Sequence, residues 1–185
     1  MERMLRALGM LELKSIAKGF SCADMVVKTA DVELVFAKPV CPGKFIILIK
    51  GGIAAVSAAI ERGKSFCDEY VVDSFLLGNP HDHVFAALNG NYEYQAVSAM
   101  GVVETWSVPA ALVAADQGAK AAQSDVVRVG LARELGGKAY VVFTGEVAAV
   151  DASIEAAVRD PRVGDKLIDT SIIPNPDKKL WEMMI

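Results

Sequence analysis

The chain has 185 residues, of which 53% are hydrophobic and only 7% aromatic, so it can fill the core of one ordinary domain or of two small ones. Its formal net charge of −4 and pI near 5.2 offer no basic field for a phosphate backbone, and no nucleic-acid partner is expected. Charged residues interrupt its most apolar region before it reaches about 18 residues, so no membrane span is expected either.

The predicted elements of the first half follow a β-α-β-β-α-β order. Alternating apolar residues indicate strands, and apolar residues at three- and four-residue spacing indicate helices. Cys41-Pro42-Gly43 breaks two apolar runs into a hairpin, and Gly78-Asn79-Pro80 forms a closing turn. The predicted ranges are 10–16 (strand), 21–30 (helix), 32–40 and 44–50 (hairpin strands), 53–66 (helix), 70–77 (strand) and 81–88 (short helix), followed by a polar linker at 89–94.

The second half repeats the first. At a shift of 92 residues the identities are Gly9 with Gly101, Glu12 with Glu104, Ser15 with Ser107, Asp24 with Asp116 and Lys28 with Lys120. We place two extra residues of the second copy directly after Lys120, so that Asp31-Val32 meets Asp125-Val126 at a shift of 94. Asn79-Pro80 meets Asn175-Pro176 at a shift of 96. The sequence therefore predicts two tandem α+β domains of ferredoxin-like order, at 1–92 and 93–185.

The two histidines, His81 and His83, are the obvious metal-ligand candidates, but they are a poor pair. If both lie on one helix, their side chains diverge by about 200° and cannot hold one ion. We interpret them as a solvated helix start.

The three cysteines contain no CxxC pair, which disfavours a disulfide framework and fits a reducing compartment. Cys22 and Cys67 lie in apolar helical stretches and are expected in the core. Cys41 lies in the hairpin bend, where its thiol is expected to face outward. It is either an unmodified surface thiol or one ligand of a site to which a three-fold axis would bring three copies.

Lys28 and Lys120 recur at the ends of equivalent predicted helices. Each is either a solvated lysine that favours the helix dipole or a contact used in assembly.

The residues described so far resemble bacterial microcompartment shell domains, in the branch of that family with two tandem, unpermuted domains and an iron–sulfur site. The resemblance covers nearly the whole chain. It rests on the openings Gly9-Met10-Leu11-Glu12 and Gly101-Val102-Val103-Glu104, the Gly-Lys pair at each hairpin bend, the run 38–45 around Cys41, and the closing Ile172-Ile173-Pro174-Asn175-Pro176.

This resemblance implies a homotrimer whose six domains imitate a hexamer and tile with other shell hexamers in the bacterial cytoplasm. It implies one 4Fe-4S cluster per trimer, bound by Cys41 of three subunits at a central pore, and a lumenal enzyme as a possible redox partner. The implied pore-lining residues are Pro42, Gly43, Lys44, Leu135, Gly136 and Gly137, and the implied tile-edge residues are Lys28, Lys120, Asn79 and Asn175. Asn79 and Asn175 stand where many relatives carry arginine.

Three functions follow as hypotheses, and the first two are not enzymatic. The leading one is a shell tile whose cluster passes electrons across the shell or is exchanged. The alternative is a tile whose pore conducts metabolites without a cluster. The third, a small-ligand sensor or enzyme, would need a deep polar pocket, and the scarcity of histidine counts against it.

Overall fold

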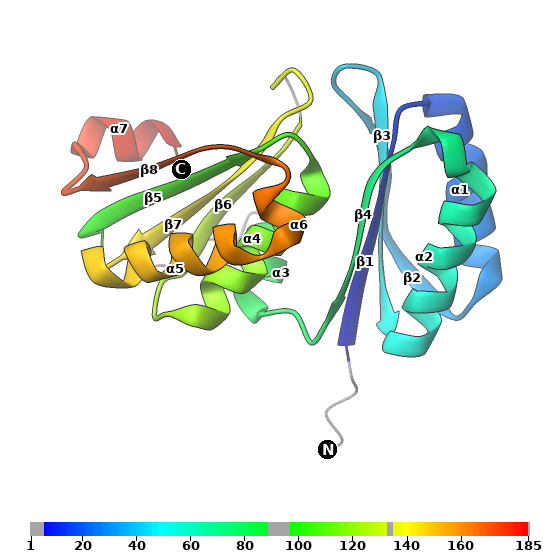
Figure 1. The fold of residues 1–185 in the computed structure, drawn as a ribbon, viewed down its shortest axis with the longest axis horizontal. Coiled ribbons are helices and arrows are strands. Elements are labelled where there is room, and N and C mark those ends of the chain that lie inside the picture. Colours follow the sequence, from blue (N-terminus) through cyan, green and yellow to red (C-terminus); the bar gives the residue numbers. More distant parts are fainter. Residues whose placement is uncertain (1–5, 89–96, 133–134, 185) are drawn as a thin grey trace. The chain divides into compact units, whose positions relative to one another are not determined.

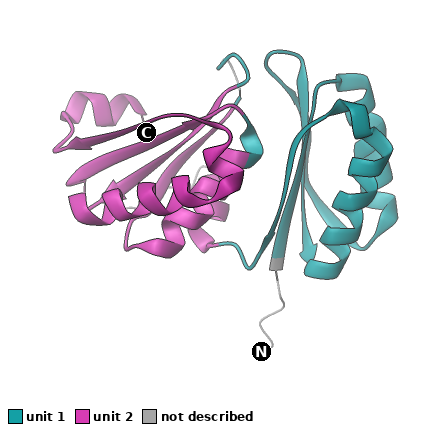
Figure 2. Cartoon of the chain, in the orientation of Figure 1, with its two compact units in different colours: residues 1–80, 107–109, 132–137 teal, residues 81–106, 110–131, 138–185 magenta. Residues whose placement is uncertain are grey.

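The structure is a computed structural model that describes residues 6–88, 97–132 and 135–184. The described residues form two compact units (Figure 2). Unit 1 holds those of 1–80 together with 107–109 and 132–137, and unit 2 holds those of 81–106, 110–131 and 138–185. The predicted domain boundary at 92/93 and the predicted linker at 89–94 lie outside the described residues.

Unit 1 is an antiparallel four-stranded sheet in the order β2-β3-β1-β4, with two helices over one face (Figure 1). Phe45, Ile47 and Ile49 of the central strand β3 are fully buried in the cluster that includes residues of both helices. Its elements are β1 (Arg6–Leu13), α1 (Ile16–Thr29), β2 (Val32–Val40), β3 (Lys44–Gly52), α2 (Ile53–Cys67), the 3-10 helix η1 (Asp68–Tyr70) and β4 (Val71–Gly78).

Unit 2 has the same architecture, with strand order β6-β7-β5-β8. Trp181 of its last helix completes a second core cluster with Met100, Val127 and Val142. Its elements are α3 (Asp82–Leu88), β5 (Ala99–Thr105), α4 (Val108–Ala121, whose first residues belong to unit 1), β6 (Asp125–Leu131), β7 (Ala139–Gly145), α5 (Val147–Arg159), α6 (Pro161–Gly164), β8 (Leu167–Pro174) and α7 (Lys178–Met184). The predicted α+β fold of two tandem ferredoxin-like domains is confirmed. None of the described helices is long and apolar enough to cross a membrane.

Strand register corrects the position of the first two-residue insertion. Leu34 pairs with Ile49 and Val126 pairs with Phe143, so β2 and β6 correspond at a shift of 92, and both strands carry their irregularity at the next residue. The insertion after Lys120 was therefore wrong. Its two residues lie in the second hairpin bend, which runs between β6 and Lys138, because a surface bend accepts extra residues without disturbing a ladder.

Two further expectations are corrected at the helix starts. The first strand ends at Leu13 rather than at position 16, because Ser15 caps α1 and its Oγ accepts a hydrogen bond from Lys18 N at 3.3 Å. His81 precedes α3, and the His81 and His83 rings therefore meet edge-on, with centroids 4.6 Å apart, instead of diverging.

Each domain brings a helix unusually close to its first strand at a glycine. A Cβ on Gly9 would lie 2.6 Å from the Ile60 side chain, and a Cβ on Gly101 would lie 2.4 Å from that of Val150. The absence of a side chain at these two positions sets the helix–sheet distance in both domains.

Candidate functional site

The bend between β2 and β3 presents Cys41 to solvent. The Cys41–Pro42 peptide is cis, and Gly43 has φ +82°, a left-handed conformation that suits glycine. Gly43 N donates a hydrogen bond to Val40 O at 3.1 Å, which closes the turn. Cys41 is exposed, as expected from the sequence.

The bend at 41–44 contacts Ala132 and Gly137 from the second hairpin, all within unit 1. Cys41 N donates to Ala132 O at 3.1 Å. Gly137 has φ +86°, and a Cβ there would lie 2.7 Å from Pro42 Cδ, so this close approach needs a glycine. The structure thus joins Pro42 and Lys44 to Gly137, while Gly43 and Gly136 are exposed and Leu135 is half-buried.

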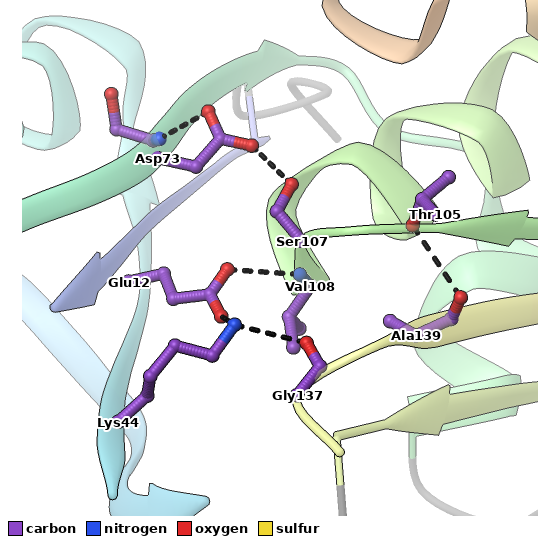
Figure 3. A network of polar contacts seen from close by, with 9 residues as sticks. Glu12, Lys44, Asp73, Thr105, Ser107, Val108, Gly137 and Ala139 are labelled. Carbon is purple, nitrogen blue, oxygen red and sulfur yellow. Dashed lines mark hydrogen bonds and ion pairs between the residues drawn. The ribbon is translucent and has the colours of Figure 1, made fainter. Parts of the chain in front are cut away.

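A buried ion pair that the sequence did not predict involves Lys44, the residue that follows this bend (Figure 3). Glu12 of β1 is fully buried, and its Oε1 lies 2.5 Å from Lys44 Nζ. Lys44 Nζ also donates to Gly137 O at 2.9 Å, and Glu12 Oε2 accepts from Val108 N at 3.0 Å. The Glu12 carboxylate therefore links Lys44, at the first bend, to the start of α4. Lys44 in turn contacts the second bend at Gly137.

Burial dominates the electrostatics of Glu12. Loss of hydration raises the pKa of this carboxyl, although Lys44 and Val108 N lower it in part, and Asp73 adds a smaller upward effect. The pair nevertheless places opposite charges in contact, so removing either partner would leave a buried charge without compensation.

A serine and an aspartate extend the same network within unit 1. Ser107 Oγ donates to Asp73 Oδ2, next to Val108 (Figure 3). Asp73 Oδ1 accepts from Ser74 N at 2.8 Å, which orients the carboxylate.

The second domain repeats the acid and the lysine in unit 2. Glu104 Oε1 lies 2.6 Å from Lys138 Nζ, but their side chains are 32% and 38% exposed, against 0% and 14% for Glu12 and Lys44. The recurrence of both residues in the sequence was the signal that could have revealed the pair.

The four predicted tile-edge residues occupy equivalent places in the two domains. Lys28 pairs with Asp24 at 2.7 Å and Lys120 with Asp116 at 2.6 Å. Asn79 and Asn175 both adopt left-handed conformations, with φ of +50° and +47°, which asparagine tolerates better than most residues.

The histidines lie at an open cavity of about 840 Å³ in unit 2. His81 N donates to Asp116 Oδ1 at 2.8 Å, and His83 Nδ1 lies 3.8 Å from Asp125. Burial, and then the nearby His83, lower the pKa of His81. Burial thus disfavours the charged ring, while the nearby carboxylates of Asp82 and Asp116 act in the opposite direction.

The other two cysteines are buried, as predicted. Cys22 Sγ lies 3.7 Å from Gly63 O, and Cys67 Sγ lies 4.0 Å from Lys18 O, so each thiol contacts the opposite helix. Burial, and then the neighbouring Cys67 thiol, raise the pKa of Cys22. Both behave as small core residues.

The donor set of one chain does not suffice for an iron–sulfur cluster. Among the described residues, no three of His, Cys, Asp and Glu come together as a metal site. Cys41 is the one exposed cysteine, and a four-iron cluster takes about four thiolates. The chain fits such a group only if copies of Cys41 from several chains converge.

The two domains share one strand order and one acid–lysine pair, so the chain is a duplicated α+β domain. The BMC domain matches residues 7–80 and 99–176, and the chain belongs to this family of bacterial microcompartment shell proteins.

Among its relatives, the chain is 40% identical to the bacterial microcompartment shell protein PduT of Citrobacter freundii, over 98% of this chain and 99% of PduT. A crystal structure of a microcompartment protein from Desulfitobacterium hafniense DCB is 39% identical, with a TM-score of 0.85 over 96% of this chain and 99% of that one. The carboxysome shell protein CsoS1 of Prochlorococcus marinus is 34% identical over 49% of this chain and 92% of its own length. The chain is a shell tile of a bacterial microcompartment, and its relatives are structural proteins.

Proposed function

We propose that this shell tile carries a 4Fe-4S cluster at a three-fold pore, held by Cys41 of three subunits. The observation that carries the proposal is the single exposed thiol, on a bend whose counterpart in the second domain contains no cysteine. A trimer would therefore present three thiolates rather than six. When bound, the cluster would supply one-electron redox chemistry at the shell, with an enzyme inside as the proposed partner.

The residues around Cys41 support this role by fixing the bend. The Glu12–Lys44 ion pair and the Lys44–Gly137 hydrogen bond hold the base of the bend while leaving Cys41 exposed. Pro42, Gly43, Leu135, Gly136 and Gly137 would form the rim of the same pore. In the assembled shell, neighbouring hexamers would contact the edges that contain Lys28, Lys120, Asn79 and Asn175.

Anaerobic purification from iron-replete cells tests the cluster. We expect about four iron and four sulfide per three chains, a brown colour, and an EPR signal after reduction. Cys41→Ala should abolish iron and colour while light scattering still shows a trimer. Cys67→Ala, which removes a buried thiol, is the matched control and should retain iron.

Two results would contradict the proposal. Iron that persists in Cys41→Ala would place the metal elsewhere. A trimeric wild-type protein without iron would favour the tile whose pore conducts metabolites.

A further inference from the structure

The two buried cysteines of unit 1 meet where helices α1 and α2 lie side by side (Figure 1). Cys22 lies in the middle of α1 and Cys67 is the last residue of α2, and they are 0% and 2% exposed. Cys22 Sγ lies 3.7 Å from Gly63 O, which is one helical turn before Cys67. Cys67 Sγ lies 4.0 Å from Lys18 O, which is one helical turn before Cys22. The contacts of the two thiols are therefore reciprocal.

Helix geometry shows that reciprocal contacts of this kind bring the two sulfurs together. In an α-helix the carbonyl of one residue accepts a hydrogen bond from the N–H four residues later, so Lys18 O lies beside the backbone of Cys22. Gly63 O lies beside the backbone of Cys67 in the same way. Burial raises the pKa of Cys22 most, and a hydrogen bond with the Cys67 thiol is the next contribution.

The glycine at position 63 allows the two helices to approach closely at this point. A Cβ on Gly63 would lie 2.5 Å from Leu11 Cδ1 and 3.4 Å from Cys22 Sγ. The Cys22 sulfur can therefore contact the backbone of α2, with Cys67 one turn further along that helix. A disulfide needs its two Cα atoms within about 7 Å of each other, and helices that touch through a glycine can reach this separation.

The second domain shows that this part of the core does not need sulfur. Ala114 of α4 takes the place of Cys22 at a shift of 92, and Pro161 takes the place of Cys67 at a shift of 94. Ala114 is fully buried, as Cys22 is. The duplication thus provides an internal comparison, in which the first domain alone places two thiols at these positions.

We infer that Cys22 and Cys67 form a reversible disulfide when the protein encounters hydrogen peroxide. Cys67 reacts first, because it ends α2 and the last turn of a helix opens more readily than its middle. Its sulfur attacks one peroxide oxygen, the O–O bond breaks, and the products are a sulfenic acid at Cys67 and water. The Cys22 sulfur then displaces the hydroxyl group from the Cys67 sulfur, and the Cys22 proton leaves with that hydroxyl as water.

The reaction converts a pair of thiols and one hydrogen peroxide into one disulfide and two molecules of water. The sulfurs are oxidised and the peroxide oxygens are reduced by the same electron pair. A small thiol such as glutathione reverses the step, because it is oxidised to its own disulfide while Cys22 and Cys67 regain their protons. The bond between Cys22 and Cys67 closes a loop of the unfolded chain, so the oxidised protein should resist unfolding better than the reduced one.

Peroxide treatment of the Cys41→Ala protein tests the inference in the absence of the exposed thiol. The folded full-length chain is incubated with hydrogen peroxide, quenched with catalase and alkylated with iodoacetamide in urea. We expect both remaining cysteines to escape alkylation, and a tryptic digest without reductant to contain one linked pair of peptides with Cys22 and Cys67. Dithiothreitol added before alkylation should restore both thiols.

Removal of either cysteine provides the controls. Cys67→Ala and Cys22→Ala, each in the Cys41→Ala background, should yield no linked peptides. The same peroxide treatment should raise the thermal midpoint of the Cys41→Ala protein by several degrees, because the loop is closed only when both cysteines are present. The midpoints of the two control proteins should not rise. A linked protein with an unchanged midpoint would contradict the stabilising effect.

The inference is overturned if Cys22 and Cys67 of the Cys41→Ala protein remain alkylatable at a peroxide dose that oxidises Cys41 in the wild-type protein. It is equally overturned if the linked peptides form only when peroxide is added in urea, or if Cys67 becomes a sulfinic acid while Cys22 stays a free thiol. The Cys41→Ala samples lack the proposed cluster ligand, and iron content of the wild-type protein decides the cluster separately. Either idea can therefore fail without the other.

Discussion

The side chain of Glu12 is fully buried, so folding removes its carboxyl group from water. A group whose pKa is raised by folding binds its proton more tightly in the native state than in the unfolded one. The native state is therefore favoured while Glu12 is protonated, and that advantage is lost as pH rises from its ordinary pKa, near 4.5, through the raised value.

We predict that Glu12→Gln flattens the pH dependence of stability in this window. In the wild-type protein, the free energy of unfolding falls as pH rises above about 4.5, because deprotonation of Glu12 creates a negative charge at a buried site. Urea unfolding from pH 4.5 to 8 at one protein concentration measures the slope. Glu155→Gln, which removes an exposed partner of Arg159, is the control and should preserve the slope. Parallel curves for wild type and Glu12→Gln would contradict the prediction.

At the residue level, the sequence predicted the exposure of Cys41 because two prolines and a glycine surround it in a bend. It did not predict the Glu12–Lys44 pair. These residues lie on neighbouring antiparallel strands near the hairpin bend, and only strand register brings their side chains together. The recurrence of the same two residue types at Glu104 and Lys138 drew attention to the positions of Glu12 and Lys44, but it did not show that the two side chains form an ion pair.

At the level of elements, helix α2 sits close to β1 because Gly9 has no side chain. The same device recurs at Gly101 beneath α5, where Val150 and Ile154 take the places of Val56 and Ile60. Close packing of this kind leaves little space for a methyl group.

We predict that Gly9→Ala lowers the free energy of unfolding by roughly 1–3 kcal/mol, because the new Cβ overlaps Val56 and Ile60. Gly52→Ala is the matched control: its Cβ would meet nothing within 4 Å, so it loses only the N-cap preference for glycine and its effect should be smaller than that of Gly9→Ala. Urea midpoints of the two variants provide the comparison. Equal midpoints would show that α2 shifts freely.

The spacing of hydrophobic residues predicted most helices and strands correctly. The wrong predictions arose where local interactions overrode that spacing. Ile16 continues the alternation of the first strand, yet the cap at Ser15 starts a helix there. The Asp-Val pairs at 31–32 and 125–126 align only by coincidence. The register of the paired strands places the insertion in the bend, and a comparison of the two sequences alone does not contain that register.

For the whole molecule, α1 presents two large apolar side chains, Ile16 and Phe20, to solvent. Burial of these two side chains against a partner would remove apolar surface from water, so we expect this face to favour association. Binding that involves only the native state raises apparent stability by mass action.

We therefore predict that the thermal midpoint rises with protein concentration across about two orders of magnitude, as expected for a native oligomer. Phe20→Asp should remove this dependence and yield smaller species in sedimentation velocity. Phe66→Asp changes another partly exposed phenylalanine, on α2, and should leave the dependence intact. A midpoint independent of concentration in the wild-type protein would argue against a partner on this face.

The unequal lengths of the two hairpin bends affect how the tile can vary. In a ring built from chains with a single domain, each substitution recurs at every position around the axis. Here one bend is two residues longer and lacks cysteine, so the two bends can accumulate changes separately. Mutation can then change the bend that contains Cys41 without changing the other bend, an independence that a chain with a single domain does not have.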